Sequence, residues 1–346
     1  MKILLIVTAF SLVGSCATPS YTKKIEALKE SIAFKNPQTV NKYNQTITTE
    51  ALRVHVQTLA SEEFEGRETG QAGFEKASLY LKDFYIQNAI PSPLGDDNYY
   101  QNIPESYFND RSPPSQNVIA YIEGSTHPEE LLIISAHLDH LGVVDEDIFY
   151  GADDNASGTA AVMMIAKAFM TAKNEGNGPK RSILFLHLTA EESGLLGSHY
   201  YVKHPIYPLN HTIANLNIDM IGRVDPHYET LQNDNYIYVI GADRLSTELH
   251  YVSEAANAQF TNLELDYKYN DDEEANRYYY RSDHYNFAFR GIPVIFYFNG
   301  EHKDYHQPTD TPDKINYPLL QKRSQLIFST AWYLVNSDHK LKLDKL

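Results

Sequence analysis

Six short apolar runs rich in β-branched residues alternate in several places with stretches of helical periodicity. The runs cover residues 117–124, 131–137, 182–190, 212–219, 235–242 and 292–298. The helical stretches cover residues 48–61, 74–87, 157–173, 245–259 and 318–335. Buried strands interleaved with helices are typical of layered α/β domains, in which helices cover a largely parallel sheet. The chain is therefore expected to fold as an α/β protein of this kind.

The N-terminal segment predicts export. It begins with Lys2, continues with an apolar stretch from Ile3 to Val13 and ends in small residues, as secretory signals do. The letters "VGSC" at 13–16 resemble the lipobox of bacterial lipoproteins, in which the cysteine carries the lipid. We expect a lipoprotein signal peptide over 1–16 with Cys16 as the lipidation site, a tether over 17–47 and one domain over 48–346. A general signal peptide with an unrelated cysteine is the alternative.

Charge and cysteine content limit the partners of the chain. The formal net charge is −16, which argues against nucleic acid or an anionic membrane surface as a partner. Contact with a membrane is therefore expected only through an N-terminal lipid. Cys16 is the only cysteine in the sequence. Zinc sites built from thiolates are excluded, and any metal site must use histidine and carboxylate side chains.

Polar residues follow the ends of the expected strands. His137 ends one run, the pair Glu191 and Glu192 follows another, and Asp219 ends a third. His306 follows the last run at short range, and the loop "GADDNASG" (151–158) leads into a helix. Ligand sites in open α/β sheets lie outside the carboxyl ends of the strands. Together these residues predict a metal site at one edge of the sheet.

Several assignments stay open at this level. The candidate ligands are one histidine of "AHLDH", one aspartate of "GADDNASG", one glutamate of the "EE" pair, Asp219 and His306. Each motif alone also fits a structural role, such as a turn or a helix start. Two metals that share a carboxylate need about five or six protein ligands. At a strand end, one glutamate can bind metal while its neighbour takes a proton from the metal-bound water.

In order along the chain, the segments "SAHLDH", "GADDNASG", "AEESGLLGS", "NIDMIGR" and "YHQPTDTPDKI" resemble a known family. This family comprises the co-catalytic dizinc exopeptidases of peptidase clan MH, family twenty-eight, and is typified by bacterial secreted aminopeptidases. The resemblance spans roughly residues 50–335. It implies a three-layer α/β sandwich with a mostly parallel, mixed central sheet flanked by helices. It also implies a metallopeptidase domain with two zinc ions per chain, for which cobalt or manganese can substitute.

The resemblance also implies roles for individual residues. His137 and Asp219 would bind one zinc, Glu192 and His306 the other, and Asp154 would bridge both, through a cis peptide to Asn155. Asp153 is the less favoured bridge. Glu191 would be the general base, Asp139 would orient the imidazole of His137, and Tyr305 would stabilise the oxyanion. The segments around residues 278–284 supply the substrate-pocket candidates Tyr279, Ser282, Asp283 and His284.

The expected activity is that of an aminopeptidase acting on peptides with a free N-terminus. A glutaminyl cyclase with one zinc, a carboxypeptidase or amidohydrolase on the same fold, and an inactive metal-binding lipoprotein are the alternatives. The acidic stretch at 269–280 fits either a rim of the site or a solvated loop. We expect a lipid-anchored protein at the periplasmic face of the outer membrane of a Gram-negative bacterium, because Ala17 is not a retention-type aspartate, or a secreted protein.

Overall fold

The computed structural model describes residues 20–109 and 112–345. The chain divides into two compact units, Met1–Ala33 and Phe34–Leu346. In the described part of the first unit lies helix α1 (Tyr21–Ser31), which is capped by the side chain of Ser20 and has no buried residue. Cys16 and the expected signal peptide lie outside the described residues. Across the ranges described, the helices are too short or too polar to cross a membrane.

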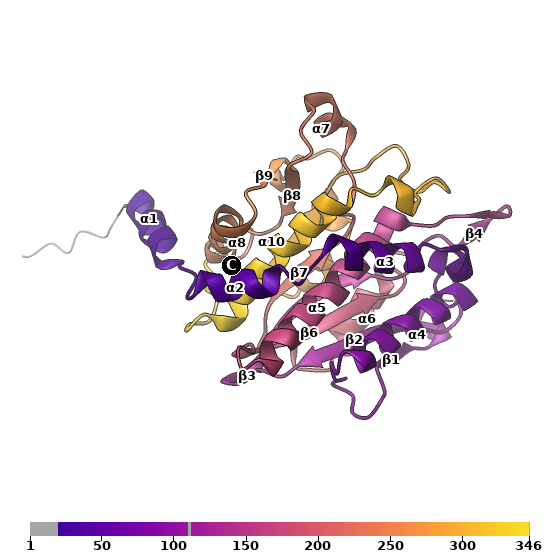
Figure 1. The fold of residues 1–346 in the computed structure, drawn as a ribbon, viewed down its shortest axis with the longest axis horizontal. Coiled ribbons are helices and arrows are strands. Elements are labelled where there is room, and N and C mark those ends of the chain that lie inside the picture. The colour runs from indigo at the N-terminus through magenta and orange to yellow at the C-terminus, as the bar shows by residue number, and fades with distance from the viewer. Residues whose placement is uncertain (1–19, 110–111, 346) are drawn as a thin grey trace, which may run out of the picture. The chain divides into compact units, whose positions relative to one another are not determined.

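The second unit is built on one eight-stranded sheet (Figure 1). The spatial order is β1 (Tyr100–Ile103), β2 (Ser115–Ile122), β6 (Arg181–Leu188), β3 (His127–His137), β7 (Thr212–Ile218), β10 (Val294–Phe298), β8 (Tyr236–Ile240) and β9 (Glu264–Asp266). The four central strands β6, β3, β7 and β10 run parallel to one another. Antiparallel pairs join β1 to β2, β2 to β6 and β8 to β10. The expectation of a mixed, mostly parallel sheet is confirmed.

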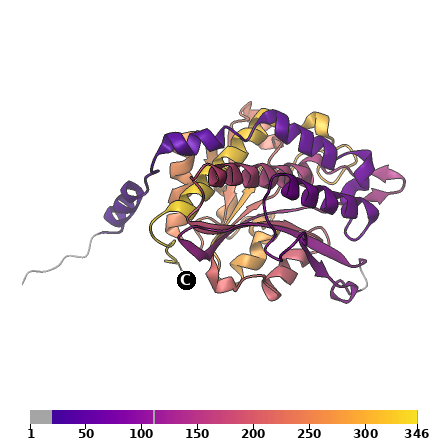
Figure 2. The same cartoon turned by 60° about the horizontal axis from the view of Figure 1, so that its bottom comes forward.

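Helices cover both faces of this sheet (Figure 2), which confirms the layered α/β architecture. The longer ones are α3 (Thr49–Leu59), α4 (Ala72–Gln87), α5 (Gly158–Asn174), α8 (Thr247–Phe260) and α10 (Tyr317–Asn336). The shorter ones are α2 (Pro37–Asn44), α6 (Leu196–Lys203), α7 (Pro226–Leu231) and α9 (His284–Ala288). Side-chain caps begin several of them: Thr48 accepts from Ala51 N, and Ser246 accepts from Leu249 N.

The boundary expected at residue 47 is wrong. The second unit already begins at Phe34, and Val40, Tyr43 and Ile47 are fully buried in it. Helix α2 has only eight residues, so its two apolar side chains gave too short a pattern to distinguish packing from a tether. The elements α6, α7, α9 and β9 were missed for the same reason. A small hairpin of β4 (Val143–Val144) and β5 (Asp147–Ile148) was missed as well.

The central strands explain the placement of the polar motifs. Every residue of β6 and β7 is buried, as expected for parallel strands covered on both faces. Because β6, β3, β7 and β10 point the same way, the loops after them emerge at one edge of the sheet. All the predicted ligands lie in or next to those loops.

Candidate metal centre

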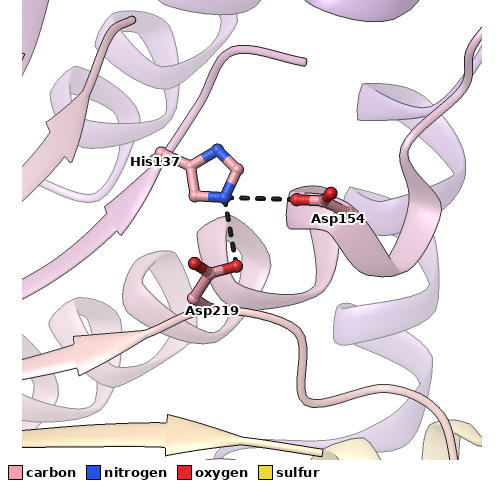
Figure 3. Close-up of side chains that lie close together, drawn as sticks. All are labelled: His137, Asp154 and Asp219. Carbon is pink, nitrogen blue, oxygen red and sulfur yellow. Dashed lines mark hydrogen bonds and ion pairs between the residues drawn. The ribbon is translucent and has the colours of Figure 1, made fainter. Parts of the chain in front are cut away.

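The first group of candidate ligands joins His137 at the end of β3 to Asp219, which follows β7 (Figure 3). The Nε2 atom of His137 lies 3.1 Å from Oδ1 of Asp219 and 3.2 Å from Oδ1 of Asp154. The other ring nitrogen, Nδ1, lies 3.0 Å from the backbone carbonyl of Asp139. An imidazole held in this way by a carbonyl presents its Nε2 lone pair to the two carboxylates.

The second group lies on the other side of Asp154. The Nε2 atom of His306 lies 3.2 Å from Oδ2 of Asp154 and 3.1 Å from Oε2 of Glu192. His140, Asp154 and Glu192 also offer atoms close enough together to share one cation. The two oxygens of Asp154 thus face different groups, as a bridging carboxylate must.

The donor atoms suit divalent cations of the zinc type. Two ligands at about 2.0–2.1 Å from a tetrahedral zinc lie about 3.3 Å apart, close to the separations in both groups. His306 Nε2 is buried and has no hydrogen-bond partner among the described residues, so its lone pair is free for a cation. His137, Asp154 and Asp219 can therefore hold one ion, and Asp154, Glu192 and His306 a second.

The loop that carries Asp154 has an irregular backbone. A π-helical turn spans Ala152–Ser157, and the peptide between Asp154 and Asn155 is cis, which confirms that expectation. Gly151 has φ +54°, and a Cβ there would lie 2.1 Å from the carbonyl of Asp154, so only glycine fits. Asn155 secures the loop by donating to Ile218 O at 2.9 Å.

Asp153 and Asp154 point to different places. Asp153 Oδ1 accepts from Gly222 N at 2.6 Å, and its Oδ2 lies 3.2 Å from Nε2 of His302. Asp310, fully buried, accepts from the backbone N–H of both Asp153 and Asp154 at 2.9 and 3.1 Å. The structure therefore favours Asp154 over Asp153 as the shared ligand, and Asp310 holds its backbone.

Asp139 contacts the imidazole of His137 through its backbone. Its backbone carbonyl, not its carboxylate, is the partner of the imidazole, because Oδ1 lies 3.9 Å from Nδ1. The carboxylate instead accepts from the backbone N–H of Glu191 at 3.1 Å and of Glu192 at 3.3 Å. One residue therefore fixes both the imidazole and the start of the "EE" loop.

Sequence reasoning missed Arg67, which is completely buried. Its guanidinium donates to the carbonyls of Leu138, Leu59, Tyr150 and Gly151 at 2.6–2.9 Å. Leu138 follows His137, and Gly151 opens the loop of Asp154, so this side chain joins both ligand loops. The "EGRETG" segment lies within residues 50–335, over which the sequence resembles the family, but nothing in its letters shows where the guanidinium points.

In the sequence, His140 was only the alternative to His137 within "AHLDH", and the family resemblance gave it no role of its own. Its ring is buried, and Nδ1 lies 2.8 Å from Oε1 of Glu192.

A cavity of about 370 Å³ opens beside the two groups. Asp154, Glu191, Glu192, Asp219 and Tyr305 are among the residues that line it. The remaining lining is mostly apolar or aromatic: Gly194, Leu195, Met220, Tyr278, Tyr280, Arg281, Phe296, Phe298 and Glu301. None of the acidic residues 271–274 contributes to the described wall.

The four substrate-pocket candidates are not among the residues that line this cavity. Within the described chain, Tyr278, Tyr280 and Arg281 line the cavity instead of Tyr279, Ser282, Asp283 and His284. A 3₁₀ turn over Tyr278–Tyr280 sends the ring of Tyr279 to the other side, under Arg244. Ser282 is buried and donates to Oδ2 of Asp219 at 2.6 Å. His284 lies with its Nε2 2.8 Å from the carbonyl of Tyr279.

Burial and crowding set the protonation of the centre. Burial raises the pKa of Glu191 well above its usual range, and the nearby carboxylates of Asp219 and Glu192 add to the rise. Burial also raises the pKa of Tyr305, with Asp154 as the next cause. For Asp154, the nearby imidazoles of His140, His137 and His306 outweigh burial and hold its pKa well below the usual range. A carboxyl with a raised pKa beside the ligands has the properties of a general base.

Fold and site together define the class of the chain: an α/β protein with a candidate centre for two cations at the carboxyl ends of parallel strands. The chain belongs to peptidase family M28, because the model of "Peptidase family M28" matches residues 117–331. That match includes all the candidate ligands.

Relatives in the same family align with about two thirds of the chain. A "Glutamate carboxypeptidase 2 homolog" of Caenorhabditis briggsae is 30% identical over 64% of this chain and 28% of its own length. "Leucine aminopeptidase 2" of Arthroderma otae is 28% identical over 63% of this chain and 44% of its own length. "Aminopeptidase YwaD" of Bacillus subtilis is 26% identical over 67% and 47%. The chain thus spans less than half the length of each of these three relatives.

Solved structures show the same fold. LapB from Legionella pneumophila superposes with a TM-score of 0.68 at 18% identity, covering 91% of this chain and 81% of that one. BSAP, described as a zinc aminopeptidase from Bacillus subtilis, superposes with a TM-score of 0.64 at 18% identity, covering 86% and 97%. These similarities support the fold assignment.

Proposed function

We propose that the chain is a zinc-dependent aminopeptidase that removes the N-terminal residue of peptides with the help of two bound zinc ions. One observation carries the proposal: the two oxygens of Asp154 face two separate ligand groups, and Glu191 lies in the same cavity wall. The names of two relatives, a leucine aminopeptidase and an aminopeptidase, support the choice of reaction.

Bound at these groups, the zinc ions would polarise the substrate carbonyl and acidify the attacking water. Glu191 takes one proton from the water as its oxygen adds to the carbonyl carbon. Tyr305, in the same wall, donates its phenolic proton in a hydrogen bond to the oxyanion. The C–N bond then breaks, and Glu191 passes the proton to the leaving amine, so that Glu191 ends as it began.

The cavity next to this wall would receive the side chain of the first residue. Met220, Phe296 and Phe298 give it an apolar surface, and the carboxylates at its base attract the free ammonium group of the substrate. An N-blocked peptide has no such positive charge, and cleavage is therefore confined to peptides with a free N-terminus.

The test compares leucine p-nitroanilide with its N-acetyl derivative, using zinc-loaded protein and a Glu191→Gln variant. We expect turnover of the free-amine substrate only, and a fall in kcat of about 10²–10⁴-fold in the variant with unchanged zinc content. Equal turnover of both substrates, or an unimpaired variant, would refute the proposal.

A carboxypeptidase is the second candidate, because the relative with 30% identity is a glutamate carboxypeptidase homolog. Release of a C-terminal glutamate from an N-acetylated dipeptide, without turnover of the arylamide, would favour it. Conversion of N-terminal glutamine into pyroglutamate would instead identify a cyclase.

We also propose that the protein is exported and anchored through a lipid on Cys16, at the periplasmic face of a Gram-negative outer membrane. The signal-like residues 1–16 support this location. Labelling of the full chain with a fatty-acid analogue in a bacterial host, compared with Cys16→Ser, tests it. Equal labelling of both proteins would exclude the anchor, and release of unlabelled protein into the medium would indicate secretion.

A further inference from the structure

The proposed function leaves His140 without a role, although its side chain is fully buried at the centre. Its Nδ1 atom lies 2.8 Å from Oε1 of Glu192 and 3.7 Å from Oδ2 of Asp154. Two roles fit such a position. His140 could be a further ligand of the ion that Glu192 and His306 bind, or it could donate a hydrogen bond that orients Glu192.

The second ring nitrogen distinguishes these roles. A histidine that binds metal through one nitrogen carries its proton on the other, which normally donates to a carbonyl or carboxylate. His137 follows that rule, because its Nδ1 lies 3.0 Å from the carbonyl of Asp139. The Nε2 atom of His140 is buried and has no hydrogen-bond partner in the described chain. If Nδ1 bound a cation, a buried N–H would be left unpaired, which is unfavourable.

The distances favour the same choice. Ligand atoms around one zinc are spaced about 3.3 Å apart, and His306 lies at 3.1 and 3.2 Å from the oxygens of Glu192 and Asp154. The 2.8 Å contact of His140 is instead that of a charge-assisted hydrogen bond. When the proton is on Nδ1, the N–H of the ring is paired with Glu192. Only the lone pair of Nε2 then has no partner among the described residues.

We propose that His140 is a positioning residue whose Nδ1–H donates to Oε1 of Glu192, which leaves Oε2 to bind the ion shared with His306. This inference rests on the proposed two-zinc centre. The backbone of Glu192 is already held by the carboxylate of Asp139. His140 therefore fixes the remaining freedom, the rotation of the carboxylate. Losing it should weaken one zinc site and spare the site of His137 and Asp219.

Three variants separate donor from ligand. In His140→Asn, the amide N–H lies as many bonds from the backbone as Nδ1, so the donor is kept and the imidazole is lost. His140→Gln places its amide at the distance of Nε2 and serves as the matched control, and His140→Ala removes both. Metal-free proteins are titrated with zinc against a chromophoric chelator. The visible absorption of the cobalt forms reports the ligand set.

For His140→Ala and His140→Gln, we expect the affinity of one zinc site to fall by about 10–100-fold, the range seen for partners of metal ligands. For His140→Asn, we expect both affinities within about threefold of wild type and the same cobalt spectrum. A His140→Asn protein as weak as His140→Ala, with an altered spectrum, would make His140 a ligand and overturn the proposal. Unchanged affinity in His140→Ala, or a wild type that binds one ion only, would also overturn it.

The readout is independent of catalysis. Thermal melts of the metal-free variants establish that they fold, and His140→Asn preserves the test if His140→Ala does not. Absent peptide hydrolysis with two intact zinc sites would contradict the proposed function alone. If peptide hydrolysis is normal but replacing His140 leaves the zinc affinity unchanged, only the proposed role of His140 would be contradicted.

Discussion

Arg67 offers a direct test of how the centre is held together. Replacing it by methionine keeps the aliphatic stem and removes the guanidinium. The change leaves the carbonyls of Leu59, Leu138 and Tyr150 without the donor that each now has at 2.6–2.9 Å, and the carbonyl of Gly151 with only the backbone N–H of Ala156. Arg67 is completely buried, so the space left by the guanidinium is closed off from bulk solvent.

The magnitude follows from these four hydrogen bonds. Each one contributes about 1 kcal/mol net, and a buried acceptor left without a partner costs about 1–3 kcal/mol. Relief of the desolvation of the guanidinium, which lowers the pKa of Arg67 to about 10, offsets part of the loss. We expect the free energy of unfolding to fall by about 3–5 kcal/mol. Arg67→Lys keeps the charge but has three donors at most, so its loss should be smaller.

Urea unfolding followed by circular dichroism, in the presence of a chelator, measures this change without a contribution from bound metal. Zinc affinity, measured separately, should also fall, because Arg67 joins the loops of His137 and Asp154. A loss of less than about 1 kcal/mol in Arg67→Met, or an equal loss in both variants, would refute the reasoning that the four carbonyl contacts carry the effect.

Three further outcomes are expected. Replacing Tyr305 by phenylalanine should lower kcat by about 10²-fold with little change in KM, if its hydroxyl acts on the oxyanion; unchanged kcat would exclude that role. Zinc at 100 times its dissociation constant should stabilise the fold by about 2.7 kcal/mol per site, seen as a rise in Tm; a Tm unaffected by zinc would contradict the centre. Burial lowers the pKa of His187 to about 3. Below pH 6.5 the imidazole of His187 therefore binds a proton in the unfolded chain but not in the folded one. The free energy of unfolding decreases as the pH is lowered from 6.5 towards 3. At pH 5, His187 should lower the free energy of unfolding by about 2 kcal/mol relative to neutral pH. Urea unfolding at both pH values should show this loss in the wild type and not in His187→Gln.

The strands and the order of the ligands could be predicted because each depends on a local pattern. Apolar runs of five to eight residues mark the buried parallel strands, and the chemistry-bearing residues come directly after them. His137 and Asp219 illustrate this: once the strands are parallel neighbours, the residues at their carboxyl ends must meet. Donor chemistry then limits the ion that such residues bind.

The cavity wall could not be predicted in the same way. In the segment around Tyr279, a 3₁₀ turn decides which of three consecutive tyrosines faces the centre, and no alternation of apolar and polar residues records that choice. Asp139 shows the same limit. Its place beside His137 was visible in the sequence, but the bend of the backbone decides that the carbonyl contacts the imidazole and the carboxylate contacts the loop of Glu191.

Arg67, Asp139 and Asp310 hold the backbone of the ligand loops for a common physical reason. Asp154, Glu191, Glu192 and Asp219 bring four carboxyl groups to one cavity, where burial and then the neighbouring carboxylates raise the pKa of Glu191. Arg67 binds loop carbonyls, and Asp139 and Asp310 bind backbone N–H groups, so the loops are fixed through peptide groups rather than through the ligands themselves. The ligand side chains are thereby left free to bind cations. Substitutions at Arg67, Asp139 or Asp310 should therefore lower fold stability and metal affinity together.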